Sequence, residues 1–301
     1  MSDTTDRAAR AALVELAERE GDEPVTITRG APDVPLVFDS PHSGRYYPED
    51  FSSVVSPRLL REYEDRFVDL LIAEAADNGI TMISAHFPRA YIDPNRAPDD
   101  LDEEMLEAVW PEPISPTRHS RQGTGLIFRR MHDKSAIYER QLTVEEVRRR
   151  LDGCWLPYHA ALEAALDAQR EPGGSVWHLN WHSMRPVGDA MTPDPGKSRA
   201  DFVLGDLKGT SCEPAFTAFV AERLRAMGYS VAVNDPYQGA YIVQRYGQPE
   251  EGRHSLQIEI NRGLYMDLGT LEKIDRFEEV RRDIGRLAGE LARWTKARQA
   301  G

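Results

Sequence analysis

The sequence has only two cysteines in 301 residues, Cys154 and Cys212, and neither belongs to a C-x-x-C pair. Sparse, unpaired cysteines are typical of a reducing compartment, so we expect a cytoplasmic protein without a disulfide framework. The chain lacks an apolar run of about 18 residues, so we predict no transmembrane helix. The first segment, MSDTTDRAARAALVELAEREGDE, is too highly charged for a secretory signal and predicts a surface helix over residues 1–24.

Positive charge is also scarce. Fifty Asp and Glu residues outnumber 37 Lys and Arg residues, which gives a net charge of −13. Nucleic acids and anionic membrane surfaces bind clustered Lys and Arg, so we expect neither as a partner. A local basic pocket for a small acid remains compatible with this balance. With 41% hydrophobic and 29% charged residues, the composition is that of a globular protein.

Several familiar catalytic signatures are missing. The sequence contains no HExxH, no GxSxG, no P-loop and no GxGxxG followed by a ribose-binding acid. These absences weaken the interpretations as a serine hydrolase, a kinase or a dehydrogenase. Neither cysteine has a local catalytic signature either, so any catalytic group must be sought among histidines, carboxylates and arginines.

Strand-like and helix-like segments alternate along the chain. Strands are predicted over 25–28, 34–39, 80–85, 175–182, 202–204, 229–233, 240–244 and 255–260. Helices are predicted over 57–78, within 134–169 with a break around 153–157, over 214–227 and within 271–301. This order favours an α/β fold with a mixed, mostly parallel sheet sandwiched by helices. Because no linker is evident, we predict a single domain over residues 1–301.

His42 follows the apolar run Leu36–Phe38 and lies in a Pro-His-Ser-Gly turn. Ligands of α/β sheets bind at loops beyond the strand ends, which directs attention to this position. A tight turn would hold the imidazole rigidly, as a metal ligand or a base requires. An ordinary surface histidine is the alternative.

His178, Asn180 and His182 alternate with apolar residues, so in a strand they would share one face. For His178, a buried hydrogen-bonded position and a ligand role both stay open. His182, at the exit of the predicted strand, is the better ligand candidate.

Glu259 lies between Ile258 and Ile260 in another strand-like run. A carboxylate there is costly to bury unless it is paired. It is therefore either a base beside a metal or half of a structural ion pair with Arg262, and the local sequence does not separate the two.

The irregular segment PRAYIDPNR at 88–96 contains Arg89 and Arg96. The planar guanidinium matches a carboxylate, so these two arginines are candidates for binding an anionic substrate. A solvated loop with internal Asp–Arg pairs is the alternative.

Ten short segments occur in a recognisable order across residues 34–267. They are PHSGRYYPEDF at 41–51, EDRFVDLL at 64–71, PRAYIDPNRAP at 88–98, GTGL at 123–126, PYHAAL at 157–162, WHSMRP at 181–186, DFVLGD at 201–206, CEPAF at 212–216, NDPYQGAYIVQRYG at 234–247 and LQIEINRGLYMD at 256–267. Together they resemble the N-formylglutamate amidohydrolase (deformylase) family. The resemblance implies a metal-dependent hydrolysis of N-formyl-L-glutamate to formate and glutamate, a step of histidine degradation, on a fold similar to that of zinc carboxypeptidases.

The resemblance also implies roles for individual residues. One divalent metal, with zinc expected, would be held by His42, Asp65 and His182. Catalysis would use Glu259 as proton shuttle and Arg89 as donor to the oxyanion, with His159 either a further acid–base partner or a core histidine. Asn95 and Arg96 would bind one substrate carboxylate, and Arg185 or Arg262 the other.

Two positions depart from the relatives' pattern. Arg45 stands where related enzymes carry an acidic metal ligand, so we assign that role to Asp65, with Glu49 and Asp69 as reserves. A solvated helix carboxylate is the alternative for Asp65. Asn180 replaces an Asp found in many members, which predicts an altered orientation of His182, a changed substrate or weakened catalysis. A deacylase of another N-acyl amino acid and a weakened binder of acidic metabolites are therefore the alternatives to the formylglutamate reaction.

Overall fold

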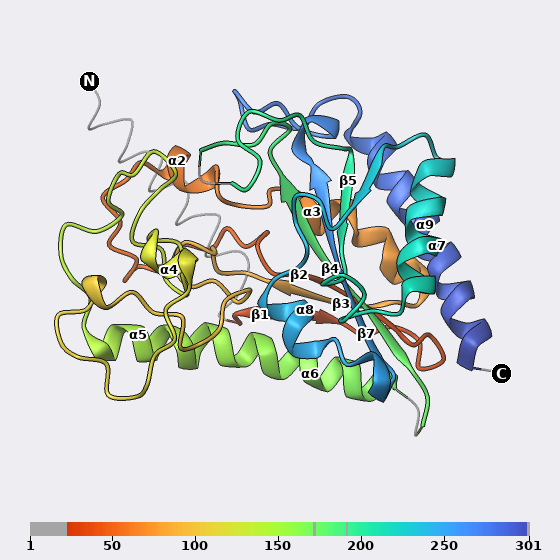
Figure 1. The fold of residues 1–301 in the computed structure, drawn as a ribbon, viewed down its shortest axis with the longest axis horizontal. Coiled ribbons are helices and arrows are strands. Elements are labelled where there is room, and N and C mark those ends of the chain that lie inside the picture. Colours follow the sequence, from red (N-terminus) through yellow and green to blue (C-terminus); the bar gives the residue numbers. More distant parts are fainter. Residues whose placement is uncertain (1–22, 171–172, 191, 300–301) are drawn as a thin grey trace. The chain divides into compact units, whose positions relative to one another are not determined.

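The computed structural model describes residues 23–170, 173–190 and 192–299 (Figure 1). The surface helix expected over residues 1–24 lies, but for its last two positions, outside the described residues. No helix among the described residues is both long enough and apolar enough to cross a membrane.

Seven strands of the described chain form one sheet in the order β1-β3-β2-β4-β7-β5-β6. Their bounds are β1 Val25–Thr28, β2 Leu36–Ser40, β3 Thr81–Ala85, β4 Val176–Met184, β5 Phe202–Gly205, β6 Val231–Val233 and β7 Arg253–Asn261. The pairs β2–β4, β4–β7 and β5–β6 are parallel, whereas β5 and β7 are antiparallel. The predicted α/β fold with a mixed, mostly parallel sheet is confirmed.

By its contacts the chain divides into two compact units. The first contains Pro41–Arg66 and Ser84–Ala160, together with the segment that ends at Thr26. The second contains Ile27–Ser40, Phe67–Ile83 and the chain from Ala161 onward. The single domain expected from the sequence stays a prediction.

The second unit holds most of the sheet and its hydrophobic core. Helices α7 (Pro214–Ala226) and α9 (Phe277–Gln299), with the short α3 (Val68–Leu71) and the 3-10 helix η1 (Ala73–Asn78), pack around this core. Figure 1 shows α7 and α9 side by side. A further short helix, α8 (Tyr241–Tyr246), contacts β7.

The two faces of the sheet differ because side chains alternate along a strand. One face supplies core residues, among them Phe38, Leu179, Trp181, Leu256 and Ile258. The other face carries the intervening polar residues Asp39, His178, Asn180, His182, Ser255, Gln257 and Glu259, all of them buried. The alternation predicted from the sequence therefore puts the candidate site residues of these strands on one face of the sheet.

The first unit contains short helices and long irregular connections. Its described helices are α2 (Pro57–Arg61), α4 (Arg118–Arg121), α5 (Val144–Arg150) and the 3-10 helix η2 (Glu103–Met105). Arg150 is 1% exposed and donates from Nη1 to the Tyr91 carbonyl (3.0 Å) and to the Tyr138 hydroxyl (2.7 Å). Its guanidinium lies 4.2 Å from the Tyr91 ring centroid, a cation–π contact that anchors the 88–96 segment.

Three predicted elements are wrong. The helix expected over 57–78 is interrupted between α2 and α3, where Glu64 and Asp65 are buried and Phe67 has φ of 65°. The strand expected over 240–244 is α8, because its buried residues Ile242, Val243 and Tyr246 recur at helical rather than alternating spacing. The break expected around 153–157 is a π-helical turn that joins α5 to α6 (Leu156–Gln169).

Candidate active site

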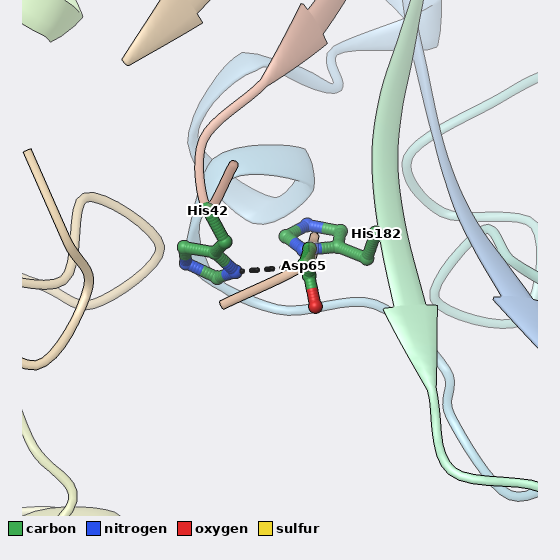
Figure 2. A group of neighbouring side chains, drawn as sticks. All are labelled: His42, Asp65 and His182. Carbon is green, nitrogen blue, oxygen red and sulfur yellow. Dashed lines mark ion pairs between the residues drawn. The ribbon is translucent and has the colours of Figure 1, made fainter. Parts of the chain in front are cut away.

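Three of the predicted metal ligands form one buried group. His42, Asp65 and His182 each offer a ligand atom, and these atoms all lie within 4.8 Å of one another. Figure 2 shows their side chains directed toward one another, with the ion pair between His42 and Asp65 dashed. The side chains are 1%, 1% and 3% exposed. Two imidazoles and a carboxylate are the donors of catalytic zinc sites, which leave a fourth position open.

Asp65 is held by the turn that follows β2. Its backbone N–H donates to the His42 carbonyl (2.9 Å), and the Ser43 hydroxyl donates to the Asp65 carbonyl (3.0 Å). Its Oδ2 lies 3.3 Å from His42 Nδ1. The expectation that Asp65 sits on a continuous helix is wrong, because this backbone bond requires the chain to leave the helix between α2 and α3. Of the two reserves, Glu49 is exposed and Asp69 half-buried.

Asp93 orients His42 from the side opposite Asp65. Its Oδ1 lies 2.7 Å from His42 Nε2 and also accepts the Asn95 N–H, while its Oδ2 accepts from Arg89. Burial by itself would raise the pKa of Asp93, but the charges of Arg89, His42 and Arg96 outweigh it and hold the pKa well below its usual value. The Asp93 carboxylate accepts a hydrogen bond from the Nε2–H of His42, so Nδ1, which faces Asp65, is the His42 nitrogen that could bind a metal.

Asn180 orients His182 in the same manner. The Asn180 Oδ1 lies 2.6 Å from His182 Nε2, so the amide accepts the imidazole N–H. Nδ1 of His182 is then the nitrogen with a lone pair for a metal. Asn180, although neutral, thus supplies an acceptor for His182.

Glu259 neighbours His182 in the sheet. The two residues are register partners in the parallel β4–β7 pair, so their side chains emerge on the same face. Glu259 is 8% exposed, and its Oε1 accepts from Gln257 Nε2 (2.9 Å). Arg262, the ion-pair partner considered in the sequence, donates from Nε to the Ser183 hydroxyl (3.0 Å).

A phenol lies near Glu259 that sequence reasoning missed. Burial, and then the negative charge of Glu259, raise the pKa of Tyr237, so this phenol keeps its proton throughout the neutral range. The Arg199 guanidinium lies 5.0 Å from the Tyr237 ring centroid and pairs with Asp194 (2.7 Å). Tyr237 belongs to the NDPYQG segment, which the sequence marked only as a family motif.

The predicted anion-binding residues are also held by hydrogen bonds. Asn95 is buried beside Asp93, and Arg96 is half-buried, donating from Nη1 to the Asn95 carbonyl and from Nε to the Thr124 carbonyl. The positive charge of Arg96 is the largest cause that lowers the pKa of His119 to about 4. A positive potential that strong favours a bound carboxylate.

The remaining predicted site residues have varied surroundings. Arg89 donates from Nε and Nη2 to Asp93, which is the internal pairing considered as the alternative. His159 is buried, stacks on Trp155 and lies 2.9 Å from the Pro94 carbonyl through Nε2. Arg185 is half-buried at the end of β4. The roles of all three stay predictions.

Two acidic residues near the histidines were missed by sequence reasoning. Asp93 was considered only as a partner for arginines, and Asp39 only as the last residue of the strand predicted over 34–39. A signal for Asp39 was present, since a carboxylate at the end of the apolar run Leu36–Phe38 must find partners when it is buried. For Asp93, no local pattern indicates a bond to a residue 51 positions away.

The fold and the comparisons with known proteins define an enzyme class, that of hydrolases acting on amide C–N bonds. The family model described as N-formylglutamate amidohydrolase matches residues 34–266. The chain therefore belongs to the N-formylglutamate amidohydrolase family.

Individual relatives agree with this membership. The N-formylglutamate deformylase of Pseudomonas aeruginosa is 29% identical over 289 residues, covering 93% of this chain and 100% of that protein. That of Pseudomonas putida is 29% identical over 250 residues, covering 78% and 82%. The crystal structure of an N-formylglutamate amidohydrolase from Ralstonia eutropha matches with 44% identity and a TM-score of 0.86, covering 91% of this chain and 99% of that one.

Proposed function

We propose that this protein hydrolyses the formyl amide of N-formyl-L-glutamate, releasing formate and glutamate, with one divalent metal as cofactor. The observation that carries the proposal is the buried group of His42, Asp65 and His182. The names of the relatives support the substrate, since they are described as N-formylglutamate deformylases.

The donor set fits a metal of the zinc type. Both imidazoles have their Nε2 hydrogen-bonded to Asp93 and Asn180 respectively, so each is oriented before any ion binds. A buried carboxylate beside two buried imidazoles is also a donor set that suits a divalent cation. When bound, a zinc ion in such a site polarises a carbonyl and lowers the pKa of water toward neutrality.

In the proposed reaction, Glu259 takes the proton of the attacking water and delivers it to the leaving amine. Glu259 is buried and is the register partner of His182, which supports this role. Arg89 would stabilise the developing oxyanion, with its guanidinium oriented by the bonds from Nε and Nη2 to Asp93. His159 would support the segment that carries Asp93 through its bond to the Pro94 carbonyl.

Two carboxylates of the substrate require two positively charged partners. We assign one to Asn95 and Arg96, whose potential already suppresses protonation of His119. The other is assigned to Arg185 or Arg262, which follow β4 and β7, the strands of His182 and Glu259. This arrangement would select acidic N-acyl amino acids over neutral ones.

The proposed acidic ligand is tested by Asp65→Asn. An amide is a weak zinc ligand, so we expect the variant to lose most of its metal and its turnover while keeping its fold. Metal content by elemental analysis and turnover of N-formylglutamate are the measurements. Asp69→Asn is the matched control and should behave as wild type. A fully metallated, active Asp65→Asn protein would mean that the third ligand lies elsewhere.

The proposed binding of a substrate carboxylate by Arg96 is tested by Arg96→Lys. Lysine keeps the charge but cannot form the planar bidentate contact, so kcat/KM should fall by about 10- to 100-fold, the range of a lost charged hydrogen bond. Steady-state kinetics should show that kcat/KM falls for N-formylglutamate but not for a substrate that lacks the carboxylate bound by Arg96. Unchanged kinetics on N-formylglutamate would mean that Arg96 does not bind the substrate and belongs to a loop with internal Asp–Arg pairs.

A deacylase of another N-acyl amino acid is the alternative enzyme. Comparing kcat/KM for N-formyl, N-acetyl and N-succinyl derivatives of glutamate and aspartate separates it from the proposal. The weakened-binder alternative rested on Asn180, and the retained bond from His182 to the Asn180 oxygen disfavours it. Binding without turnover of any of these compounds by metal-loaded protein would support that alternative.

A further inference from the structure

A continuous chain of hydrogen bonds crosses the polar face of the sheet. It runs from Ser255 Oγ to His178 Nδ1 (2.8 Å), from His178 Nε2 to Asp39 Oδ1 (2.9 Å), from Asp39 Oδ1 to Asn180 Nδ2 (2.8 Å) and from Asn180 Oδ1 to His182 Nε2 (2.6 Å). These five residues are at most 3% exposed. Water therefore cannot replace any member readily.

The Asp39 carboxylate fixes which group donates and which accepts in each hydrogen bond of this chain. A carboxylate only accepts, so the amide nitrogen of Asn180 must face Asp39 and the amide oxygen must face His182. An oxygen facing Nε2 requires the proton on that nitrogen. On the other side, His178 donates from Nε2 to Asp39, and its Nδ1 accepts from the Ser255 hydroxyl.

We propose that Asp39 is a positioning residue for the metal site, fixing the Asn180 amide and thereby the tautomer of His182 that presents Nδ1 to the metal. This inference rests on the proposed metal site. It also explains how a neutral amide two residues before His182 can orient this ligand, since the amide itself is bonded to a carboxylate, that of Asp39.

The proposal has a specific consequence for restoring an acid at position 180. Asn180→Asp would set two carboxylates about 3 Å apart, and like charges at that distance oppose each other. Alone, it should weaken the site rather than improve it. Combined with Asp39→Asn, it reverses the three bonds between Ser255 and position 180, while His182 Nε2 still donates to position 180 and every bond can still form. The Asp39→Asn amide would donate to both neighbours, His178 would accept at Nε2 and donate from Nδ1, and the Ser255 hydroxyl would become the acceptor.

The test compares Asp39→Asn, Asn180→Asp and the double variant, with Ser255→Ala as control. Zn²⁺ affinity is measured by competition with a chromophoric chelator. We expect Asp39→Asn and Asn180→Asp each to lower the Zn²⁺ affinity by about 10- to 100-fold, as the loss of an outer hydrogen-bond partner does. The Zn²⁺ affinity of the double variant should return to within a few-fold of the wild-type value. Ser255→Ala, at the far end of the chain, should melt earlier but bind Zn²⁺ normally.

A second measurement needs no metal. Nitrogen-15 shifts of the imidazoles in metal-free protein should show His182 protonated at Nε2 in wild type and in the double variant, and a tautomer mixture in Asp39→Asn. If Asp39→Asn keeps both the wild-type tautomer and Zn²⁺ affinity, or if the losses of the two singles simply add in the double variant, Asp39 has no positioning role. If wild type binds no Zn²⁺, the proposed function fails, whereas the tautomer measurement still tests the role of Asp39.

Discussion

Replacing either His42 or His182 by alanine is expected to leave a folded protein with little bound metal and almost no turnover. Each imidazole supplies one of the three ligand atoms that lie within 4.8 Å of one another. Losing a ligand should cost more metal affinity than the 10- to 100-fold typical of losing an outer hydrogen-bond partner. Elemental analysis of the purified variants and turnover of N-formylglutamate measure the two effects.

The matched control is His132→Ala, which removes a half-buried histidine that pairs with Glu62 at 3.8 Å, outside the metal-ligand group. It should keep wild-type metal content and activity. Excess Zn²⁺ should restore neither His42→Ala nor His182→Ala fully, because two remaining donors bind the ion weakly. Full metal occupancy in both alanine variants would refute the assignment of His42 and His182 as metal ligands.

Changing Glu259 to Gln is expected to lower kcat by roughly 10²–10⁴-fold, the usual contribution of a general acid–base group. Glutamine has nearly the same shape and keeps an oxygen to accept from Gln257 Nε2, so folding and metal content should change little. The measurements are kcat, metal content and the melting temperature. If Glu259 were instead half of a structural pair, the variant would lose stability and Arg262→Ala would reproduce that loss.

Arg262→Ala separates these two interpretations. The Arg262 Nε bonds to the Ser183 hydroxyl, so we expect its removal to act through this contact and through substrate binding. It should raise KM for N-formylglutamate more than it lowers kcat. A Glu259→Gln protein that melts early yet turns over normally while folded would contradict the catalytic assignment.

The sheet and its polar face follow from local sequence. Two strands are predicted over 175–182 and 255–260, where the structure has Val176–Met184 and Arg253–Asn261, and the alternation of polar and apolar residues over 178–182 predicts that His178, Asn180 and His182 share a face. Alternation is a property of neighbouring residues, so it can be read without knowing what the strands touch. The position of His42 after a buried strand was accessible for the same reason.

Other local patterns were ambiguous because short segments satisfy more than one period. The run 240–244 contains β-branched and aromatic residues, yet it folds as α8, since its apolar side chains meet the rest of the structure at helical spacing. Residues 57–78 have helical spacing throughout, yet the chain leaves the helix where the Asp65 N–H bonds to the His42 carbonyl. In both places tertiary contacts outweigh a propensity of a few tenths of a kcal/mol per residue.

By itself, then, the sequence determined the fold class, the family resemblance and the histidines, because each depends on composition, periodicity or motif order. For the carboxylates, the resemblance suggested Asp65 with two reserves, and only the tertiary structure showed that Asp65 and Asp93 lie beside His42 and that Asp39 lies beside Asn180. Asp65 and Asp93 lie 23 and 51 positions from His42, and Asp39 lies 141 positions from Asn180. A hydrogen bond depends on distances of about 3 Å between atoms, and the chain length separating two residues does not specify that distance until the intervening elements have packed.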